Sequence, residues 1–227
     1  MIDPELEKEV RDRRAELVSS LVQWGAENLR DFPWRSGRSP YKVLVAEVIL
    51  RRTTATAAAR VYDEITQRYP DVLALSQANT CDLEVLLLSV GYYKRRALIL
   101  KEAAALVVAE YGGEIPDTQE ALLRIPQVGP YTAGAILCLG FGIPAAMVDS
   151  NVLRIISRLF CNSLPNQAYQ TVLEVAEAVI PKEGCDLFNL AMLDLGALVC
   201  RYDRPRHDLC PLISVCDTVV DHLFTKT

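Results

Sequence analysis

The strongest candidate for chemistry is Asp149, a single carboxylate that stands directly before the amphipathic segment beginning at Ser150. A fixed carboxylate can stabilise positive charge that develops during a reaction, or it can orient an attacking water. The start of a helix favours its ionised form, because the helix dipole is positive there. The same placement also predicts an ordinary helix N-cap, and Asp149 taken in isolation favours that plainer interpretation.

A second candidate lies upstream, where Pro126–Pro130 forms a tight turn that runs into a helix beginning near Tyr131. Gly129 is expected to supply the backbone freedom that such a turn requires. The unpaired N–H groups at a helix start suit a phosphate. The pattern predicts a backbone site for an anion, with Asp149 facing the adjoining cleft.

Glu47 is a lone carboxylate within the apolar run of residues 43–50. Burial there would raise its pKa and let it donate a proton near neutral pH. An ion pair with Arg51, one helical turn later, is an equally good interpretation of the same residues.

Two of these segments carry a resemblance to a known family. Ile125–Ala133 resembles the helix-hairpin-helix of the endonuclease III and MutY DNA glycosylases, and Met147–Val152 resembles their downstream segment ending in the catalytic aspartate. The resemblance extends from about residue 31 to residue 217. It implies excision of damaged or mismatched bases from double-stranded DNA, with Asp149 as the catalytic carboxylate. The implied fold is all-α and two-lobed, with a six-helix lobe at 35–143 and a second lobe formed by 1–34 and 144–227.

The resemblance also bears on the type of reaction. Bifunctional members of the family carry a lysine where this chain has Tyr131, and the lysine amine attacks the sugar to form a Schiff base. Tyrosine has no such amine, so we expect base excision without strand cleavage. Glu47 matches the position of a catalytic glutamate in the MutY family, which favours a functional role for it.

Arg51-Arg52-Thr53-Thr54 resembles the mismatch thymine glycosylases that act on G·T pairs, whereas adenine-removing members typically show Gln-Gln-Thr. Arginine pairs well with guanine edges, so this segment is expected to enter the base stack or contact the orphaned guanine. Gln127 stands where the hairpin usually has its first glycine, which predicts a weaker grip on the phosphate. The expected DNA-binding residues are Arg51, Arg52, Gln127, Val128, Gly129, Tyr131 and Thr132.

Four residues near the C-terminus have the spacing of the family's iron–sulfur ligands, Cys-x6-Cys-x2-Cys-x5-Cys, with histidine in the second place. They are Cys200, His207, Cys210 and Cys216. Three thiolates and an imidazole can hold a [4Fe–4S] cluster, and the same set suits tetrahedral zinc. We expect the cluster first, zinc second and an empty site third. In each case its role would be to order residues 201–206, whose arginines would meet phosphates.

Composition sets the remaining bounds. The chain has 227 residues, 51% of them hydrophobic, a net charge of −5 and a pI near 5.2, which argues against a general nucleic-acid binder. Basic clusters at 51–52, 94–96 and 201–206 are each, taken alone, more typical of a solvated face. No apolar run is long enough to cross a bilayer, and the charged N-terminus resembles no signal peptide. We expect a monomeric protein of the cytoplasm, associated with the nucleoid and not with membranes.

Apolar periodicity predicts helices throughout and no sheet. The expected ranges are 4–30, 41–53, 55–69, 71–77, 80–88, 93–111, 119–124, 171–179 and 187–199, with further helices after the hairpin and after Asp149. Ser39 is expected to cap the helix that Pro40 begins.

The leading hypothesis is a monofunctional DNA glycosylase that flips out and removes thymine or uracil opposite guanine. The first alternative is an adenine-specific glycosylase of the MutY type. The second is a non-catalytic, lesion-sensing DNA-binding protein, which the acidic charge, Gln127 and His207 favour. An α-helical interaction protein without lesion preference is the plainest alternative.

Overall fold

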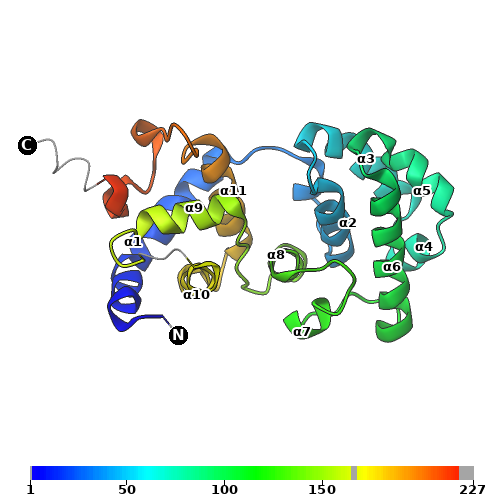
Figure 1. Cartoon of the computed structure of the whole chain (residues 1–227), viewed down its shortest axis with the longest axis horizontal. Coiled ribbons are helices and arrows are strands. Elements are labelled where there is room, and N and C mark those ends of the chain that lie inside the picture. The colour runs from blue at the N-terminus through cyan, green and yellow to red at the C-terminus, as the bar shows by residue number, and fades with distance from the viewer. Residues whose placement is uncertain (1, 165–167, 220–227) are drawn as a thin grey trace, which may run out of the picture. The chain divides into compact units, whose positions relative to one another are not determined.

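The computed structural model describes residues 2–164 and 168–219, and every regular element in these ranges is a helix (Figure 1). The chain divides into two compact units. Unit 1 comprises Met1–Arg30 and Ile143–Thr227, and unit 2 comprises Asp31–Gly142. Since the described elements are all helical, the predicted all-α fold is confirmed. Unit 2 begins four residues before the predicted lobe 35–143 and ends one residue before it. None of the described helices combines the length and apolar character needed to span a membrane.

Unit 2 is built around the apolar helix α2 (Pro40–Leu50), which packs against α3 (Ala55–Arg68) and α6 (Tyr93–Tyr111). As predicted, Ser39 caps α2, because its hydroxyl accepts a hydrogen bond from the Lys42 amide at 3.3 Å. The remaining elements are η1 (Pro33–Arg35), α4 (Val72–Ser76), α5 (Thr80–Leu87), η2 (Leu88–Val90), α7 (Gln119–Leu122), α8 (Pro130–Ala135) and the π-helical η3 (Ile136–Phe141).

Close approach of η3 to α2 depends on Gly140. A Cβ atom at this position would lie 2.8 Å from the Cα of Pro40, so no larger residue fits without a backbone shift. The contact places the hairpin helix beside the helix that carries Glu47, within one unit. Packing between α2 and the hairpin is thus what positions the polar residues of unit 2.

Unit 1 joins the N-terminal helix to the last third of the chain. Helix α1 (Pro4–Asn28) packs on α10 (Tyr169–Val179) and α11 (Cys185–Leu198), and α9 (Ser150–Leu159) packs on both of these (Figure 1). The short helices η4 (His207–Leu209) and η5 (Ile213–Val215) follow. An apolar core fills this unit, with Leu17, Leu21, Val172, Ala191 and Leu195 among its fully buried members.

Candidate active site and nucleic-acid interface

Asp149 is the N-cap of α9, as its position before Ser150 suggested. Its Oδ1 accepts hydrogen bonds from the backbone amides of Asn151 and Val152, each at 2.8 Å. Its Oδ2 accepts a third bond, at 2.9 Å, from the Asn151 side-chain amide. Three donors therefore fix the carboxylate in one orientation at the positive end of a helix. Capping the helix and stabilising charge in a reaction both require a carboxylate fixed at this position. The observed cap is therefore compatible with either role.

A chain of hydrogen bonds connects Asp149 with the segment that carries Cys200. The Asn151 Oδ1 accepts from the guanidinium of Arg154 at 2.9 Å, and Arg154 also donates to the carbonyls of Gly196 at 2.8 Å and Cys200 at 2.9 Å. Gly196 makes this contact possible, because a Cβ there would lie 2.5 Å from the Cβ of Asn151. Asn151 and Arg154 were not predicted from the sequence as members of this site. The polar positions of the strongly amphipathic helix α9 were the available signal.

Unit 2 contains a pocket of about 530 Å³ that brings together three segments far apart in the sequence. Four guanidinium groups border it, together with an exposed tyrosine and a glutamine. Its lining residues are Val48, Arg51, Arg52, Tyr92, Arg95, Arg96, Ile99 and Gln127. Three of the predicted DNA-binding residues, Arg51, Arg52 and Gln127, thus share one concave and strongly basic site.

Backbone strain is concentrated in the same pocket. Among the described residues, the non-glycine residues with positive φ are Arg52 at 49°, Tyr92 at 46° and Gln127 at 63°, and all three line it. Each left-handed residue costs about 1–2 kcal/mol, and such strain is typical of functional sites. The expectation that Gly129 supplies the freedom of the hairpin turn is wrong, since its φ is −99°. Gln127 adopts the left-handed conformation instead.

The hairpin leads into α8, with Gly129 as its N-cap and Pro130 in its first turn. Gly129, Tyr131 and Thr132 lie at this helix start, as expected. The predicted contribution of Val128 fails, because its amide donates to the Ile125 carbonyl at 3.0 Å and its side chain is buried. The Val128 N–H is therefore engaged within the turn and is not available to a phosphate.

Glu47 is half-buried in α2, and Arg51 follows it by one turn. Burial lowers the pKa of Arg51, while the negative charge of Glu47 acts in the opposite direction. The Arg51 guanidinium donates to the Gln127 carbonyl, which ties the end of α2 to the hairpin. The attraction between Glu47 and Arg51 is present, and a proton-donating role for Glu47 stays a prediction.

Cys200, His207, Cys210 and Cys216, the four predicted ligands, border one small cavity of unit 1. Burial, reinforced by the neighbouring thiols, raises the pKa of Cys216 to about 11, and burial raises that of Cys210. Arg158 approaches the Cys200 Sγ at 3.3 Å. Within the described ranges, no three Cys, His, Asp or Glu side chains converge on one point in the manner of a formed metal centre. The donor set suits a soft metal ion or cluster, and the cavity has all four donors on its wall.

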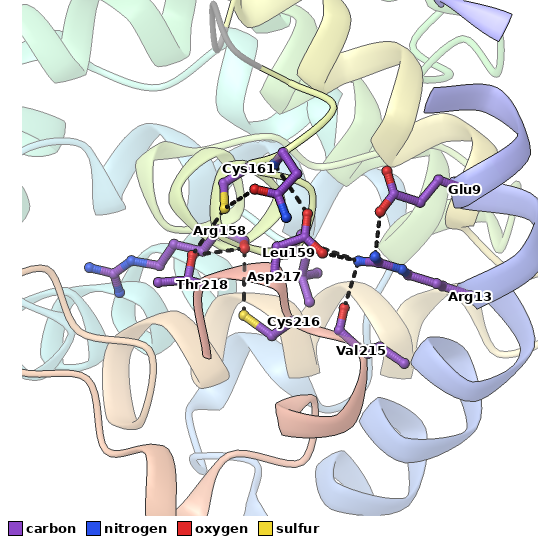
Figure 2. A network of polar contacts seen from close by, with 10 residues as sticks. Glu9, Arg13, Arg158, Leu159, Cys161, Val215, Cys216, Asp217 and Thr218 are labelled. Atoms are coloured by element: carbon purple, nitrogen blue, oxygen red, sulfur yellow. Dashed lines mark hydrogen bonds and ion pairs between the residues drawn. The ribbon is translucent and has the colours of Figure 1, made fainter. Parts of the chain in front are cut away.

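A polar network holds the end of this loop against α1 (Figure 2). Arg13 donates to Asp217 Oδ1 at 2.6 Å, to the Leu159 carbonyl at 2.9 Å and to the Val215 carbonyl at 3.1 Å, and it pairs with Glu9. Asp217 is 3% exposed. The network fixes the backbone on both sides of Cys216.

The helical fold, the hairpin before α8 and the capped aspartate after it together define a helix-hairpin-helix protein of the base-excision class. Residues 45–182 match the HhH-GPD superfamily of base excision DNA repair proteins, and the chain belongs to this family.

Two relatives and one solved structure that resemble this chain have more specific names than the family as a whole. The thymine/uracil-DNA glycosylase of Methanothermobacter thermautotrophicus is 36% identical over 206 residues, covering 90% of this chain and 93% of the relative. The thymine-DNA glycosylase of Aeropyrum pernix is 35% identical over 202 residues, covering 86% and 91%. The solved structure of a thermostable thymine-DNA glycosylase superposes with a TM-score of 0.88 at 35% identity, covering 93% of this chain and 98% of that one.

Proposed function

We propose that this protein is a monofunctional DNA glycosylase that removes thymine or uracil mispaired with guanine by hydrolysing the N-glycosidic bond. The observation that carries the proposal is the pocket in which Arg51 and Arg52 gather with Gln127. A guanidinium matches the O6 and N7 acceptors of guanine, and flipping the target base leaves that guanine without a partner. The thymine- and uracil-specific names of the relatives support the same substrate class.

In the proposed reaction Asp149 stabilises the positive charge that builds on the sugar as the base departs. Its three hydrogen-bond donors hold the carboxylate in one orientation before substrate arrives. Tyr131 cannot form a Schiff base, so the product is an abasic site in an uncut strand. Glu47 supplies a proton to the leaving base, and the attacking water loses a proton as its oxygen bonds to the sugar. The enzyme acts on double-stranded DNA as a monomer in the cytoplasm, at the nucleoid.

The test is base release from labelled duplexes containing G·T, G·U, G·A or 8-oxoguanine·A, with and without alkali. Strand breaks at G·T and G·U that appear only after alkali are expected. Asp149→Asn should lower the single-turnover rate by about 10² to 10³, while binding of the mismatch duplex persists. Release of adenine would move the protein to the MutY type. Breaks without alkali would contradict the role given to Tyr131, and a fully active D149N variant would remove Asp149 from the chemistry.

We further propose that Cys200, His207, Cys210 and Cys216 hold a [4Fe–4S] cluster with one histidine ligand, in a structural role. Their placement around a single cavity supports this. Purification without chelators, followed by iron, acid-labile sulfide and zinc analysis, distinguishes cluster, zinc and neither. Cys216→Ser should lose the bound metal and lower the unfolding temperature. Matching the wild-type metal content in this variant would exclude the site.

A further inference from the structure

Arg96 was grouped by sequence with the solvated basic cluster at 94–96, but it is only 3% exposed. Its guanidinium donates to five backbone carbonyls in two segments. Nη1 donates to Val48 at 2.6 Å and to Ile49 at 2.9 Å, and Nη2 donates to Arg51. Nε donates to Gly91 at 2.9 Å, and Nη2 also reaches Val90 at 3.2 Å. This side chain thus bonds the end of α2 to the end of η2.

These acceptors explain how a charge is tolerated there. Val48 and Ile49 lie in the last turn of α2, and Val90 ends η2, so their carbonyls are the unpaired acceptors that helix C-termini leave. A cation in that place is stabilised by the helix dipole. Burial lowers the pKa of Arg96 from its ordinary value, and the charge of Arg51 lowers it further. Within the part of the chain that the structure describes, the hydrogen-bond acceptors of Arg96 are all backbone carbonyls, which makes its position sensitive to the shape of the two segments.

Each of the three pocket residues with positive φ is tied to Arg96 by hydrogen bonds, either directly through the carbonyl that precedes it or through the Arg51 side chain. The Arg51 carbonyl directly precedes left-handed Arg52, and the Gly91 carbonyl directly precedes left-handed Tyr92. The Arg51 side chain continues the chain of bonds to the carbonyl of left-handed Gln127. Left-handed conformations of residues with a Cβ persist only where their surroundings enforce them. Arg96 supplies that enforcement for Arg52 and Tyr92 directly, and for Gln127 through Arg51.

We propose that Arg96 is the positioning residue for opposite-base recognition: it holds Arg52, Tyr92 and Gln127 in the conformations that present their side chains to the guanine left by base flipping. This rests on the proposed function. Tyr92, whose side chain is 68% exposed, offers an aromatic face to a base, and Arg52 offers the fork that guanine accepts. Lysine cannot replace Arg96, because three donors on one nitrogen cannot reach carbonyls spread around a planar fork.

The test compares Arg96→Met and Arg96→Lys with Arg68→Met, which removes an exposed arginine of the same unit that lies outside the pocket. Two duplexes are used for each protein: thymine opposite guanine and thymine opposite an abasic site. Binding is measured in parallel on duplexes carrying a stable abasic analogue opposite guanine or opposite a second abasic analogue. Single-turnover rates and affinities are corrected for the folded fraction.

In R96M the preference for guanine over no opposite base should fall by about tenfold or more in both rate and affinity, as expected for loss of one good base contact. R96K should lose most of the preference, and R68M should keep it. An equal decline on both duplexes would overturn the proposal, because a residue that only stabilises the fold does not distinguish them. If wild type releases no base but R96M still loses the binding preference, the proposed reaction fails and the role of Arg96 stands. If R96M does not fold, R96K decides.

Discussion

Each unit has a region where arginines lie among backbone carbonyls, and these two regions balance the charge in different ways. In unit 1, Arg13 pairs with Asp217 and Glu9, and Arg30 pairs with the buried Asp194 at 2.6 Å. In unit 2, the pocket gathers four guanidinium groups, and none of the described residues that line it is an aspartate or glutamate. The first arrangement is balanced by carboxylates of the protein, whereas the exposed arginines of the second, Arg52 and Arg95, provide positive charge that suits an anion from outside. A chain with net charge −5 can therefore still present a local surface suited to DNA.

The largest effect on stability is expected from breaking the internal pair of unit 1. Asp217→Ala removes the buried carboxylate that accepts from Arg13 and from the Asn162 amide at 3.2 Å, so the partly buried Arg13 keeps only Glu9 as a carboxylate partner among the described residues. The free energy of unfolding should fall by about 3 kcal/mol in denaturant titrations. Asp82→Ala is the matched control, since Asp82 meets Arg68 at the same 2.6 Å on the surface and should cost under about 1 kcal/mol. Equal losses would show that burial does not distinguish the two pairs.

The second prediction separates the cap of α9 from the orientation of its carboxylate. Asn151→Ala removes the bond to Asp149 Oδ2 and leaves both backbone amides in place. The single-turnover rate on G·T should therefore fall about ten- to a hundredfold, because small misplacements of a catalytic group are costly. The unfolding temperature should hardly change. A large stability loss with an unchanged rate per folded molecule would mean that Asn151 acts only in packing.

The third prediction concerns the positive charge of the exposed arginines that line the pocket of unit 2. Arg95→Gln removes one exposed cation from the pocket, so the slope of log affinity against log salt should become shallower by about one. Arg68→Gln lies outside the pocket and should leave the slope unchanged. Fluorescence anisotropy of a labelled mismatch duplex at several salt concentrations measures both. Equal slopes for R95Q and wild type would show that Arg95 meets no phosphate.

Local signals account for what the sequence predicted well. Ser39 caps α2, Asp149 caps α9, and the helix 93–111 matches its predicted ends, because caps and apolar periodicity act within a few residues. Burial of Arg96 was not predictable in this way, since its acceptors lie at 48–51 and 90–91 and only folding brings those segments together. The short η1 lies outside the predicted helices, and its Trp34 packs edge-on against Tyr62 at 5.9 Å. Tertiary contacts decide such positions.

The smallest effect on stability is expected at Gln127. Its backbone conformation favours glycine, whereas its proposed role in the pocket needs the glutamine side chain. Its φ of 63° suits glycine, so Gln127→Gly should raise the free energy of unfolding by about 1 kcal/mol through relief of strain. The Gln127 carbonyl that binds Arg51 belongs to the backbone and remains in the variant. The lost side chain leaves the pocket wall, so the preference for guanine opposite the target should decline. A variant that is more stable and equally selective would show that the left-handed glutamine serves the turn alone. A destabilised variant would mean that contacts of the Gln127 side chain within unit 2 contribute more stability than the left-handed conformation costs.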